Sequence, residues 1–418
     1  MTSPHIHIIG AGLAGLSTAL YAGLGGLKTT LYEGTLHAGG RCRSYDDREL
    51  GCRIDNGNHL MLSGNIAVLD YVAQCGAADT LTSPAVAHYP FFDVRTRAHW
   101  RIRFNRGKIP LWALHKKSRA PETSVADYLS LGKFLWAPHD QTIQQLFPPH
   151  HPLYEKLIEP LTLAIHNTHP AEASAGLMRN VLMQSFFMGA EACRPLMPVA
   201  GLSESLVDPC LAKLPQLGGA IKFGRRLRGV ILGEDRIISL DFTDGLVHLD
   251  EHDWVVLATP GWVTSDLLPS LTIPNDYRAI INVHFRQDVP RNDMGFTGFI
   301  GGVCQWVFVK PGVVSVTISA GDEWINAPSP DLAARCWADI ATLYGLDAAS
   351  VPPYRIVKEK RATFAATPAQ LQRRPTACTP WRNLLLAGDY TDTALPSTIE
   401  GSLRSGLKAA QILLRWVG

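Results

Sequence analysis

Residues 6–33 read IHIIGAGLAGLSTALYAGLGGLKTTLYE, and the rest of the chain can be interpreted outward from them. Apolar residues 5–9 predict a strand, the glycine-rich residues 10–15 a turn, residues 16–24 a helix, and residues 28–32 a second strand. Such a succession is typical of a unit that binds the phosphates of a dinucleotide. The N-terminus of its helix offers free N–H groups and the positive end of a dipole.

The three glycines of the turn have separate predicted roles. Gly10 permits the tight turn, Gly12 lets a pyrophosphate approach the backbone, and Gly15 lets helix and strand pack closely. The predicted phosphate-binding residues are Gly10, Gly12, Leu13, Ala14 and Gly15. Glu33 follows the second strand about 20 residues past the turn, where a carboxylate binds a ribose 2′-hydroxyl. Its charge would repel a 2′-phosphate, so NADP is disfavoured.

Two other interpretations of this stretch are an ordinary glycine-rich loop and a signal peptide or membrane helix, because residues 6–27 carry no charge. Six glycines in that span, with no Lys or Arg before it, argue against the signal peptide and the membrane helix.

Composition narrows the class further. The chain has 418 residues, enough for two domains, and a net charge of +2, which gives no sign of nucleic-acid binding. Eight cysteines form no CxxC pair, and no secretory signal precedes them. We therefore expect reduced thiols in a cytoplasmic protein rather than disulfides or a zinc site.

A second glycine loop follows Glu33: residues 39–44 read GGRCRS. Taken alone this could be a basic surface loop. After the preceding unit it resembles the flavin amine oxidase and phytoene desaturase superfamily, whose FAD domain is glutathione-reductase-like. The resemblance implies that FAD is the cofactor, that Gly40 passes close to it, and that Arg41 and Arg43 lie by its pyrophosphate.

The end of the chain carries a matching motif. Residues 383–390 read NLLLAGDY, and the resemblance implies that Gly388 and Asp389 bind the ribityl or pyrophosphate part of FAD. Residues 397–401 (STIEG) begin a final helix, in which Ser397 and Glu400 have the spacing of a capping box. By resemblance its N-terminus points at the flavin N1–O2 edge, where N–H groups stabilise the anionic reduced flavin. The remaining cofactor-binding residues implied by resemblance are His59, Leu60, Val230, Thr259, Ser397, Thr398 and Ile399.

A narrower resemblance rests on residues 53–65 (RIDNGNHLMLSGN) and 359–364 (EKRATF). They look like the squalene-associated FAD-dependent enzymes, the hydroxysqualene dehydroxylases of bacterial hopanoid pathways. Membership would imply a long apolar isoprenoid substrate, hydride transfer from reduced flavin, loss of water and neighbouring squalene-pathway enzymes. The departing hydroxyl needs an acid, for which His59, His166 and His284 are the candidates. His166 and His169 could instead hold a metal, but nearby acids are few, so we expect none.

These motifs predict an α/β protein in which a Rossmann-type FAD domain is interleaved with an α+β substrate domain containing an antiparallel sheet. The expected FAD-binding parts are residues 1–85, 195–270 and 365–418. The expected substrate-domain parts are residues 86–194 and 271–364.

Between residues 94 and 119 there are nine Lys or Arg residues and no acid, with Ile109, Leu111, Trp112 and Leu114 among them. One interpretation is a strand with a solvated face. The other is a surface that rests on anionic lipid, peripheral to the inner face of the cytoplasmic membrane.

Three other functions remain open at this point. A carotenoid-type desaturase would run the hydride the other way. A prenyl-binding escort resembling the GDP-dissociation inhibitors shares the fold without catalysis. An amine oxidase would need an aromatic sandwich at the flavin, which is not evident near residues 375–381.

Overall fold

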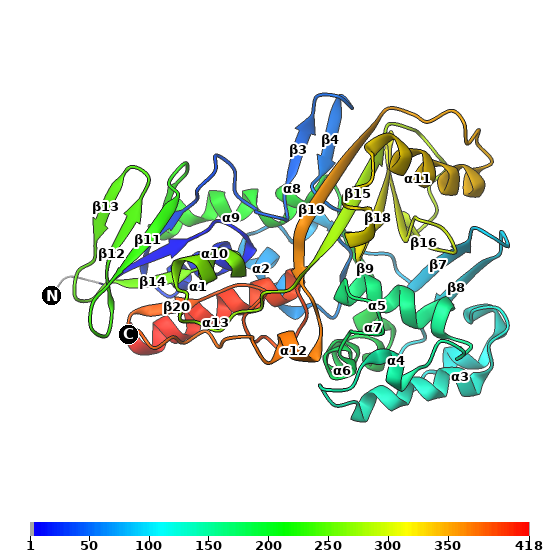
Figure 1. Ribbon diagram of the computed structural model, residues 1–418, viewed down its shortest axis with the longest axis horizontal. Coiled ribbons are helices and arrows are strands. Elements are labelled where there is room, and N and C mark those ends of the chain that lie inside the picture. The colour runs from blue at the N-terminus through cyan, green and yellow to red at the C-terminus, as the bar shows by residue number, and fades with distance from the viewer. Residues whose placement is uncertain (1–3, 418) are drawn as a thin grey trace.

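The computed structural model describes residues 4–417. One half is built on a five-stranded parallel sheet of order β10–β2–β1–β14–β20 (Figure 1). Its strands are β1 (His5–Ile9), β2 (Lys28–Tyr32), β10 (Ala220–Lys222), β14 (Trp254–Leu257) and β20 (Leu384–Leu386). These segments come from distant parts of the sequence, so the chain leaves this sheet and returns to it repeatedly. The predicted α/β class with a Rossmann-type sheet is confirmed.

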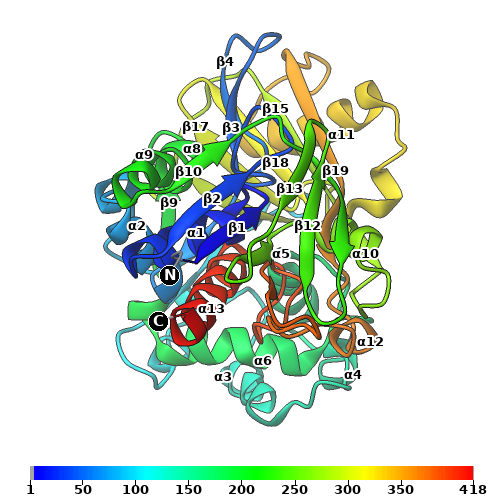
Figure 2. The ribbon, with the colours of Figure 1, turned by 90° about the vertical axis from the view of Figure 1, so that its left-hand side faces the viewer.

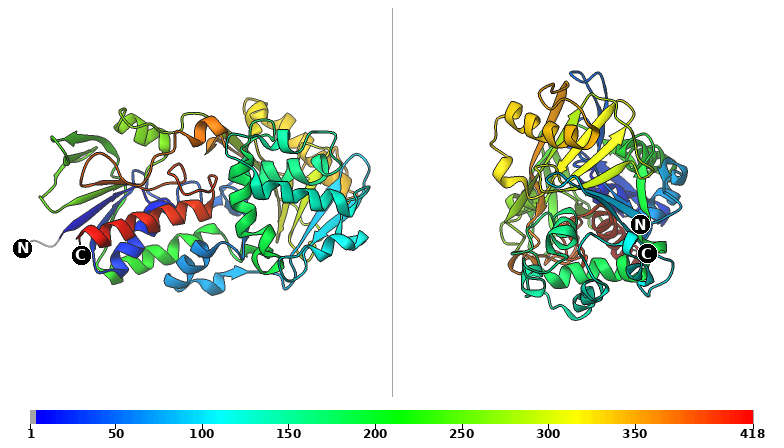
Figure 3. Two further views of the ribbon diagram at one scale, coloured as in Figure 1. Left: turned by 90° about the horizontal axis from the view of Figure 1, so that it is seen from below. Right: turned by 90° about the vertical axis from the view of Figure 1, so that its right-hand side faces the viewer.

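Both faces of the parallel sheet are buried, as is usual for parallel strands. On β1, Ile6 and Ile8 pack toward helices α1 (Leu13–Leu24) and α13 (Ile399–Val417), which lie side by side (Figure 3, left). Ile9 on the opposite face packs against an antiparallel sheet of β11 (Leu227–Leu232), β12 (Ile237–Phe242) and β13 (Gly245–His248), seen in Figure 2.

The other half is built on a seven-stranded sheet of order β19–β15–β18–β17–β16–β7–β8. Its strands are β7 (His88–Asp93), β8 (His99–Arg103), β15 (Tyr277–Phe285), β16 (Phe296–Ile300), β17 (Trp306–Lys310), β18 (Val313–Ile318) and β19 (Tyr354–Phe364). The prediction of an antiparallel sheet is wrong at one junction, because β7 and β16 run parallel. The β7–β8 hairpin enters from an earlier part of the chain, so no hairpin turn forces β16 to oppose β7.

Two helical layers enclose this sheet. Helix α11 (Ser329–Tyr344) covers the face that carries Ile281, Val283 and Phe285. The opposite face, with Phe91, Phe296 and Trp306, packs against the helical segment of residues 111–193. That segment contains the α-helices α3 (Val125–Leu129), α4 (Ile143–Leu146), α5 (Glu159–His166), α6 (Ala175–Gln184) and α7 (Ala190–Cys193). It also contains the 3-10 helices η2 (Leu111–Leu114), η3 (Lys116–Ser118), η4 (Ser130–Trp136) and η6 (Phe186–Met188), and the π-helix η5 (Tyr154–Ile158).

The remaining elements lie within or between the two halves. They are β3 (Ser44–Asp47), β4 (Cys52–Asp55), β5 (Met61–Leu62), α2 (Ile66–Gln74), η1 (Ala78–Thr80), β6 (Leu81–Thr82), β9 (Pro195–Pro198), α8 (Leu202–Leu206), α9 (Asp208–Lys213), η7 (Leu214–Leu217), α10 (Gly261–Leu267), η8 (Gly321–Trp324) and α12 (Pro368–Leu371). Within residues 4–417, no helix combines the length and apolar character that a membrane crossing requires.

The predicted capping box of the last helix is wrong. Thr398, not Ser397, caps α13, since its hydroxyl accepts the Gly401 N–H at 3.0 Å. Glu400 is buried and turns to another helix: its carboxylate accepts the N–H groups of Ala67 and Val68 at 3.1 and 3.0 Å. These amides lie in the first turn of α2, so α13 supplies the N-terminal acceptor that α2 itself lacks.

Candidate functional site

The glycine turn after β1 is crowded at two positions and open at the third. Gly10 has φ +108°, and a Cβ there would lie 2.6 Å from the Ala258 carbonyl oxygen. A Cβ on Gly15 would lie 1.9 Å from the carbonyl oxygen of Gly10. A Cβ on Gly12 would meet nothing within 4 Å, so the backbone there faces open space. This is the space that a pyrophosphate would need.

Helix α1 begins beside this space without a side-chain cap. Gly12 is its N-cap, and Leu13 and Ala14 are its first residues. The second glycine loop packs against the same turn: the Gly39 N–H donates to the Ala11 carbonyl at 2.8 Å, and a Cβ on Gly40 would lie 3.6 Å from the Gly12 Cα. The two predicted loops therefore adjoin, and the arrangement fits a phosphate group.

Glu33 lies directly after β2 and reaches back to the turn. Its carboxylate accepts the Ala11 N–H at 3.0 Å, and its other oxygen accepts the N–H and hydroxyl of Thr35, each at 2.9 Å. The carboxylate is thus held beside the glycine turn, where the sequence predicts a ribose contact.

Arg41 and Asp389 join the two ends of the chain. The guanidinium lies 2.7 Å from the Asp389 carboxylate across 348 residues of sequence, and it also donates to the Ala362 carbonyl. Burial alone would raise the pKa of Asp389, but the charge of Arg41, with help from Ser397, holds that pKa below its usual value. The carboxylate is therefore ionised at neutral pH.

Arg374 is a member of this site that the sequence did not reveal. Its guanidinium donates to the Asp389 carbonyl and the Thr393 hydroxyl at 3.2 and 3.1 Å, and also to the Thr391 carbonyl. It lies over the Phe364 ring at 4.9 Å. Burial lowers its pKa to about 10. A lone arginine in a turn that contacts backbone carbonyls has no local signature.

The other predicted cofactor residues are held by separate contacts. The Gly388 N–H donates to Ser405 Oγ at 2.8 Å, which ties the end of β20 to α13. Thr259 follows β14 and shares a 2.7 Å hydrogen bond with Thr264. The Arg43 carbonyl accepts the Asn56 N–H at 2.8 Å. Val230 is half-buried on β11 and packs toward the parallel sheet.

Residues 56–60 form one of the contacts between the two halves. Asn282 on β15 accepts the Asn58 N–H at 3.3 Å and the Thr317 hydroxyl at 2.8 Å. The Asn58 side chain donates to the same hydroxyl at 3.1 Å. His59 and Leu60, both half-buried, follow directly, so this network fixes the segment on which they lie.

The sheet face that this segment contacts is a row of polar side chains beside aromatic ones. Asn282, Thr317 and Trp306 are cross-strand neighbours and therefore share a face. His284, Ser315 and Phe308 form the next row. This face looks toward the helical segment of residues 111–193.

Asp55 is the charged group that links these histidines. Its carboxylate lies 2.5 Å from Lys310 Nζ and accepts the Ser44 hydroxyl at 2.6 Å and the Leu202 N–H at 3.0 Å. Burial would raise its pKa, but Lys310 and these hydrogen bonds hold it below the usual value. The Asp55 charge acts on both His59 and His284.

The three candidate acids have different surroundings. Burial lowers the pKa of His59, with Asp55 opposing and Arg41 reinforcing that effect. His284 shares a 2.7 Å hydrogen bond with Ser315, and burial lowers its pKa to about 4. His166 is fully buried with no partner on either ring nitrogen among residues 4–417, and its pKa falls to about 3. Burial therefore favours the neutral imidazole at all three positions, and most strongly at His284 and His166.

Of the predicted residues, the structure brings together the glycine turn, Glu33, Gly40, Arg41 and Asp389. His166 has no hydrogen bond to this group among residues 4–417. The neighbouring Asn167 fixes its position, since its side chain donates to Thr363 Oγ1 at 2.9 Å and accepts the Ala320 N–H at 2.6 Å. Residues 4–417 contain no group of three His, Cys, Asp or Glu side chains placed to hold a metal.

The class of protein follows from comparison with known families. Residues 13–414 match the flavin-containing amine oxidoreductases, a match that runs through both sheets, so the chain belongs to that family. Its glycine turn would accordingly hold a flavin. The chain also resembles the cyclohexylamine oxidase of Brevibacterium oxydans IH-35A in fold, with a TM-score of 0.73 over 100% of both chains at 13% identity.

Two relatives define its place within the family. The chain is 46% identical over 413 residues to the hydroxysqualene dehydroxylase of Rhodopseudomonas palustris, covering 99% of each. It is 42% identical over 410 residues to that of Sinorhizobium fredii, covering 98% of each. At these identities the chain groups with the hydroxysqualene dehydroxylases.

Proposed function

We propose that this protein removes the hydroxyl group of hydroxysqualene to give squalene. When bound, reduced FAD supplies the hydride that forms the new C–H bond, and the hydroxyl leaves as water. The observation that carries the proposal is full-length similarity to two dehydroxylases, together with the Arg41–Asp389 pair beside an open phosphate turn.

The residues present fit FAD as the particular flavin. Gly10, Gly12, Leu13, Ala14 and Gly15 would hold the pyrophosphate, with Gly40, Arg41 and Arg43 on its other side. Glu33 would accept the ribose hydroxyls, and Val230 would meet the adenine. Asp389 with Gly388 would bind the ribityl chain, and the amides of Ser397, Thr398 and Ile399 would lie at the flavin ring with Thr259 and Leu60.

The chain must also protonate the departing oxygen, and we assign this role to His59. Two charges act on its imidazole: that of Arg41, which belongs to the cofactor site, and that of Asp55, which favours the imidazolium. His284 lies on the adjacent sheet face with one free ring nitrogen among the described residues, and His166 has two. These two neutral imidazoles would orient the substrate by hydrogen bonding rather than donate its proton.

The aromatic side chains beside the polar row suit the substrate. Loss of an allylic hydroxyl leaves a delocalised cation, which aromatic faces stabilise. Phe91, Phe296 and Trp306 meet at ring-centroid distances of 5.6 to 5.9 Å. They would form the wall along which a long apolar isoprenoid lies.

Anaerobic incubation of the flavin-loaded enzyme with a reductant and hydroxysqualene, followed by product analysis, tests this function. We expect squalene from wild type and little from His59→Gln, while His166→Gln and His284→Gln should mainly raise KM. A desaturase would instead oxidise squalene under oxidised flavin. An escort would bind isoprenoid and carry no stoichiometric flavin.

The substrate also determines where the protein must act. A triterpenoid is insoluble in water, so we propose that it arrives from a membrane or from a neighbouring squalene-pathway enzyme. The protein would then be cytoplasmic and peripheral to the inner face of the cytoplasmic membrane.

A further inference from the structure

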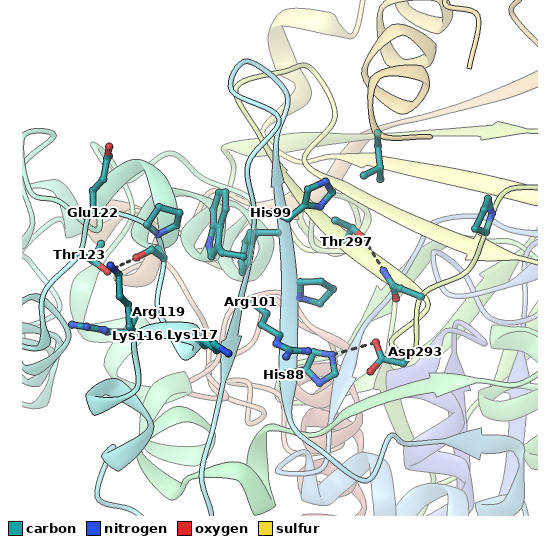
Figure 4. A pocket seen from close by; sticks show the side chains of 18 of the residues that line it. His88, His99, Arg101, Lys116, Lys117, Arg119, Glu122, Thr123, Asp293 and Thr297 are labelled. Carbon is teal, nitrogen blue, oxygen red and sulfur yellow. Dashed lines mark hydrogen bonds and ion pairs between the residues drawn. The ribbon is translucent and has the colours of Figure 1, made fainter. Parts of the chain in front are cut away.

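A cavity of about 710 Å³ opens on the outer side of the seven-stranded sheet, away from the residues assigned to the cofactor (Figure 4). Its floor is the β7–β8 hairpin, with Arg101 at the centre. On one side lies the segment with Lys116, Lys117 and Arg119, and on the other lie His88 and Asp293. Apart from Phe91, which also belongs to the aromatic wall proposed for the substrate, no residue that lines this cavity has a role in the proposed reaction.

The cavity carries unbalanced positive charge. Its four cations, Arg101, Lys116, Lys117 and Arg119, outnumber its two carboxylates. Of these carboxylates, Glu122 lies 2.7 Å from Lys156, and Asp293 lies 3.3 Å from His88, whose pKa is lowered by burial. Arg101, Lys116, Lys117 and Arg119 have no carboxylate within ion-pair distance in the part of the chain that the structure describes. The Nε of Arg119 is buried without a hydrogen-bond acceptor. Such a cavity is complementary to an anion with several acceptor oxygens.

A second cavity, of about 610 Å³, adjoins the first and shares Arg101 and Lys117 with it. It adds Arg103, His115 and Arg194 to the lining. The basic residues therefore form one continuous positively charged surface along β8 and η3, not a set of isolated charges in solvent.

Apolar side chains project next to this positively charged surface. In the loop between β8 and η3, Ile109, Leu111 and Leu114 are 70%, 53% and 61% exposed, and Lys108 precedes them. Buried Trp112 anchors the loop in the aromatic core of the helical layer. A solvated strand face explains Arg101 and Arg103 on β8, but it does not explain three exposed aliphatic side chains within six residues. Aliphatic groups next to unpaired cations are typical of a surface that enters the lipid headgroup layer.

We propose that this face is a docking site for an anionic phospholipid membrane, in which Arg101, Lys116, Lys117 and Arg119 bind headgroup phosphates while Ile109, Leu111 and Leu114 enter the interfacial layer. The proposal deepens the proposed function, because a membrane would hold its apolar substrate. The docking proposal itself rests on the charge of the basic side chains and the exposure of the aliphatic ones, and it can be tested without measuring enzyme activity.

Co-sedimentation with vesicles tests the charge. Wild type should bind vesicles of phosphatidylcholine with phosphatidylserine, bind pure phosphatidylcholine weakly, and be released from the anionic vesicles by salt. The variant Lys108→Glu/Lys116→Glu/Lys117→Glu should bind the anionic vesicles roughly a hundredfold more weakly, since each basic side chain near such a surface contributes about fivefold. The control Lys28→Glu/Lys408→Glu/Arg415→Glu changes net charge equally at exposed positions elsewhere and should bind as wild type does.

Two further arms test the mode of contact. Ile109→Ser/Leu114→Ser should weaken binding and leave its salt dependence unchanged, because it removes only apolar insertion. Inorganic phosphate or diphosphate, titrated by calorimetry, should bind weakly and compete poorly with vesicles. Tight phosphate binding that abolishes vesicle binding would assign the cavity to a free phosphate compound and overturn the lipid proposal.

The membrane-docking proposal would also be overturned if the triple variant bound anionic vesicles as well as wild type does, or if vesicle binding were insensitive to salt. Turnover of detergent-dispersed hydroxysqualene separates this proposal from the proposed function. The triple variant should retain that turnover, since its changes lie outside the cofactor site. A wild-type protein that binds anionic vesicles and never yields squalene would refute the proposed function alone.

Discussion

At the scale of single residues, Glu33 combines a structural and a proposed cofactor role. Its carboxylate already holds the Ala11 N–H at the glycine turn. We expect Glu33→Ala to weaken FAD binding about ten- to a hundredfold, because charge-assisted hydrogen bonds contribute about 1.5–3 kcal/mol. Fluorescence titration of the apoprotein with FAD measures this.

The matched control for Glu33 is Thr35→Val, which removes the hydroxyl bonded to the same carboxylate and leaves the carboxylate in place. It should bind FAD nearly as wild type does. Wild-type affinity in Glu33→Ala would exclude a ribose contact.

His284 makes stability depend on pH. Its pKa in the folded protein is lowered from 6.5 to about 4, so the fold favours the neutral ring. The stability it provides is complete above pH 6.5 and is lost as pH falls toward 4, because only the unfolded chain takes up the proton. The free energy of unfolding should fall between pH 7 and pH 5, and we expect this fall to be about 2 kcal/mol smaller in His284→Gln than in wild type. Urea unfolding at the two pH values measures it.

Exposed His37 provides the comparison for this pH effect. His37→Gln should keep the wild-type pH dependence. If His284→Gln keeps it too, the buried imidazole does not govern stability in this range.

At the level of single residues, prediction from the sequence also reached its limit. The glycine turn of residues 10–15 is local, so its spacing alone predicted a phosphate site, whereas the role of Gly388 and Asp389 was implied by the resemblance to a known family. Asn282 and Lys310 act through partners 224 and 255 residues away in sequence, and Arg374 acts through backbone carbonyls 15 and 17 residues further along. Each looks like an ordinary polar residue where it stands. Only the folded chain brings them to Asn58, Asp55 and the Asp389 carbonyl.

At the scale of elements, helix α13 shows how a local pattern can mislead. Ser397 and Glu400 have capping-box spacing, yet Glu400 bonds amides in α2 across more than 330 residues. Sequence spacing could locate the strands and helices, including the β7–β8 hairpin, because alternation and turn residues are local. It could not give the parallel pairing of β7 with β16, which depends on the path of the whole chain.

The contact between α13 and α2 can be measured. We expect Glu400→Ala to lower the free energy of unfolding by about 1–3 kcal/mol, because two buried amides lose their acceptor. Thr398→Ala should cost about 1 kcal/mol as an ordinary cap. Chemical denaturation of both variants decides between these roles: a Glu400→Ala loss no larger than that of Thr398→Ala would show that α2 does not need the carboxylate.

At the scale of the whole molecule, the flavin should hold distant segments together. Asp389 lies near the end of the chain and Arg41 near its start, and both belong to the proposed cofactor site. We expect Asp389→Ala to release flavin while the fold persists, and to lower the melting temperature by as much as flavin removal lowers it in wild type.

Differential scanning calorimetry with and without added FAD measures this effect. The control is Asp392→Ala, an exposed acid three residues away, which should keep flavin and melting temperature. An Asp389→Ala protein that stays yellow and equally stable on dilution would remove Asp389 from the site.

The 348 residues between Arg41 and Asp389 also have a consequence during protein synthesis. At about 5–20 residues per second, a ribosome needs roughly 20–70 seconds to make the second residue after the first. Throughout that interval the parallel sheet lacks β20, and once β14 (Trp254–Leu257) has been made, its aliphatic edge has no neighbour until β20 follows. A nascent chain should therefore be unable to retain FAD until β20 and α13 have left the exit tunnel, and stalled chains should be captured by chaperones rather than by the cofactor.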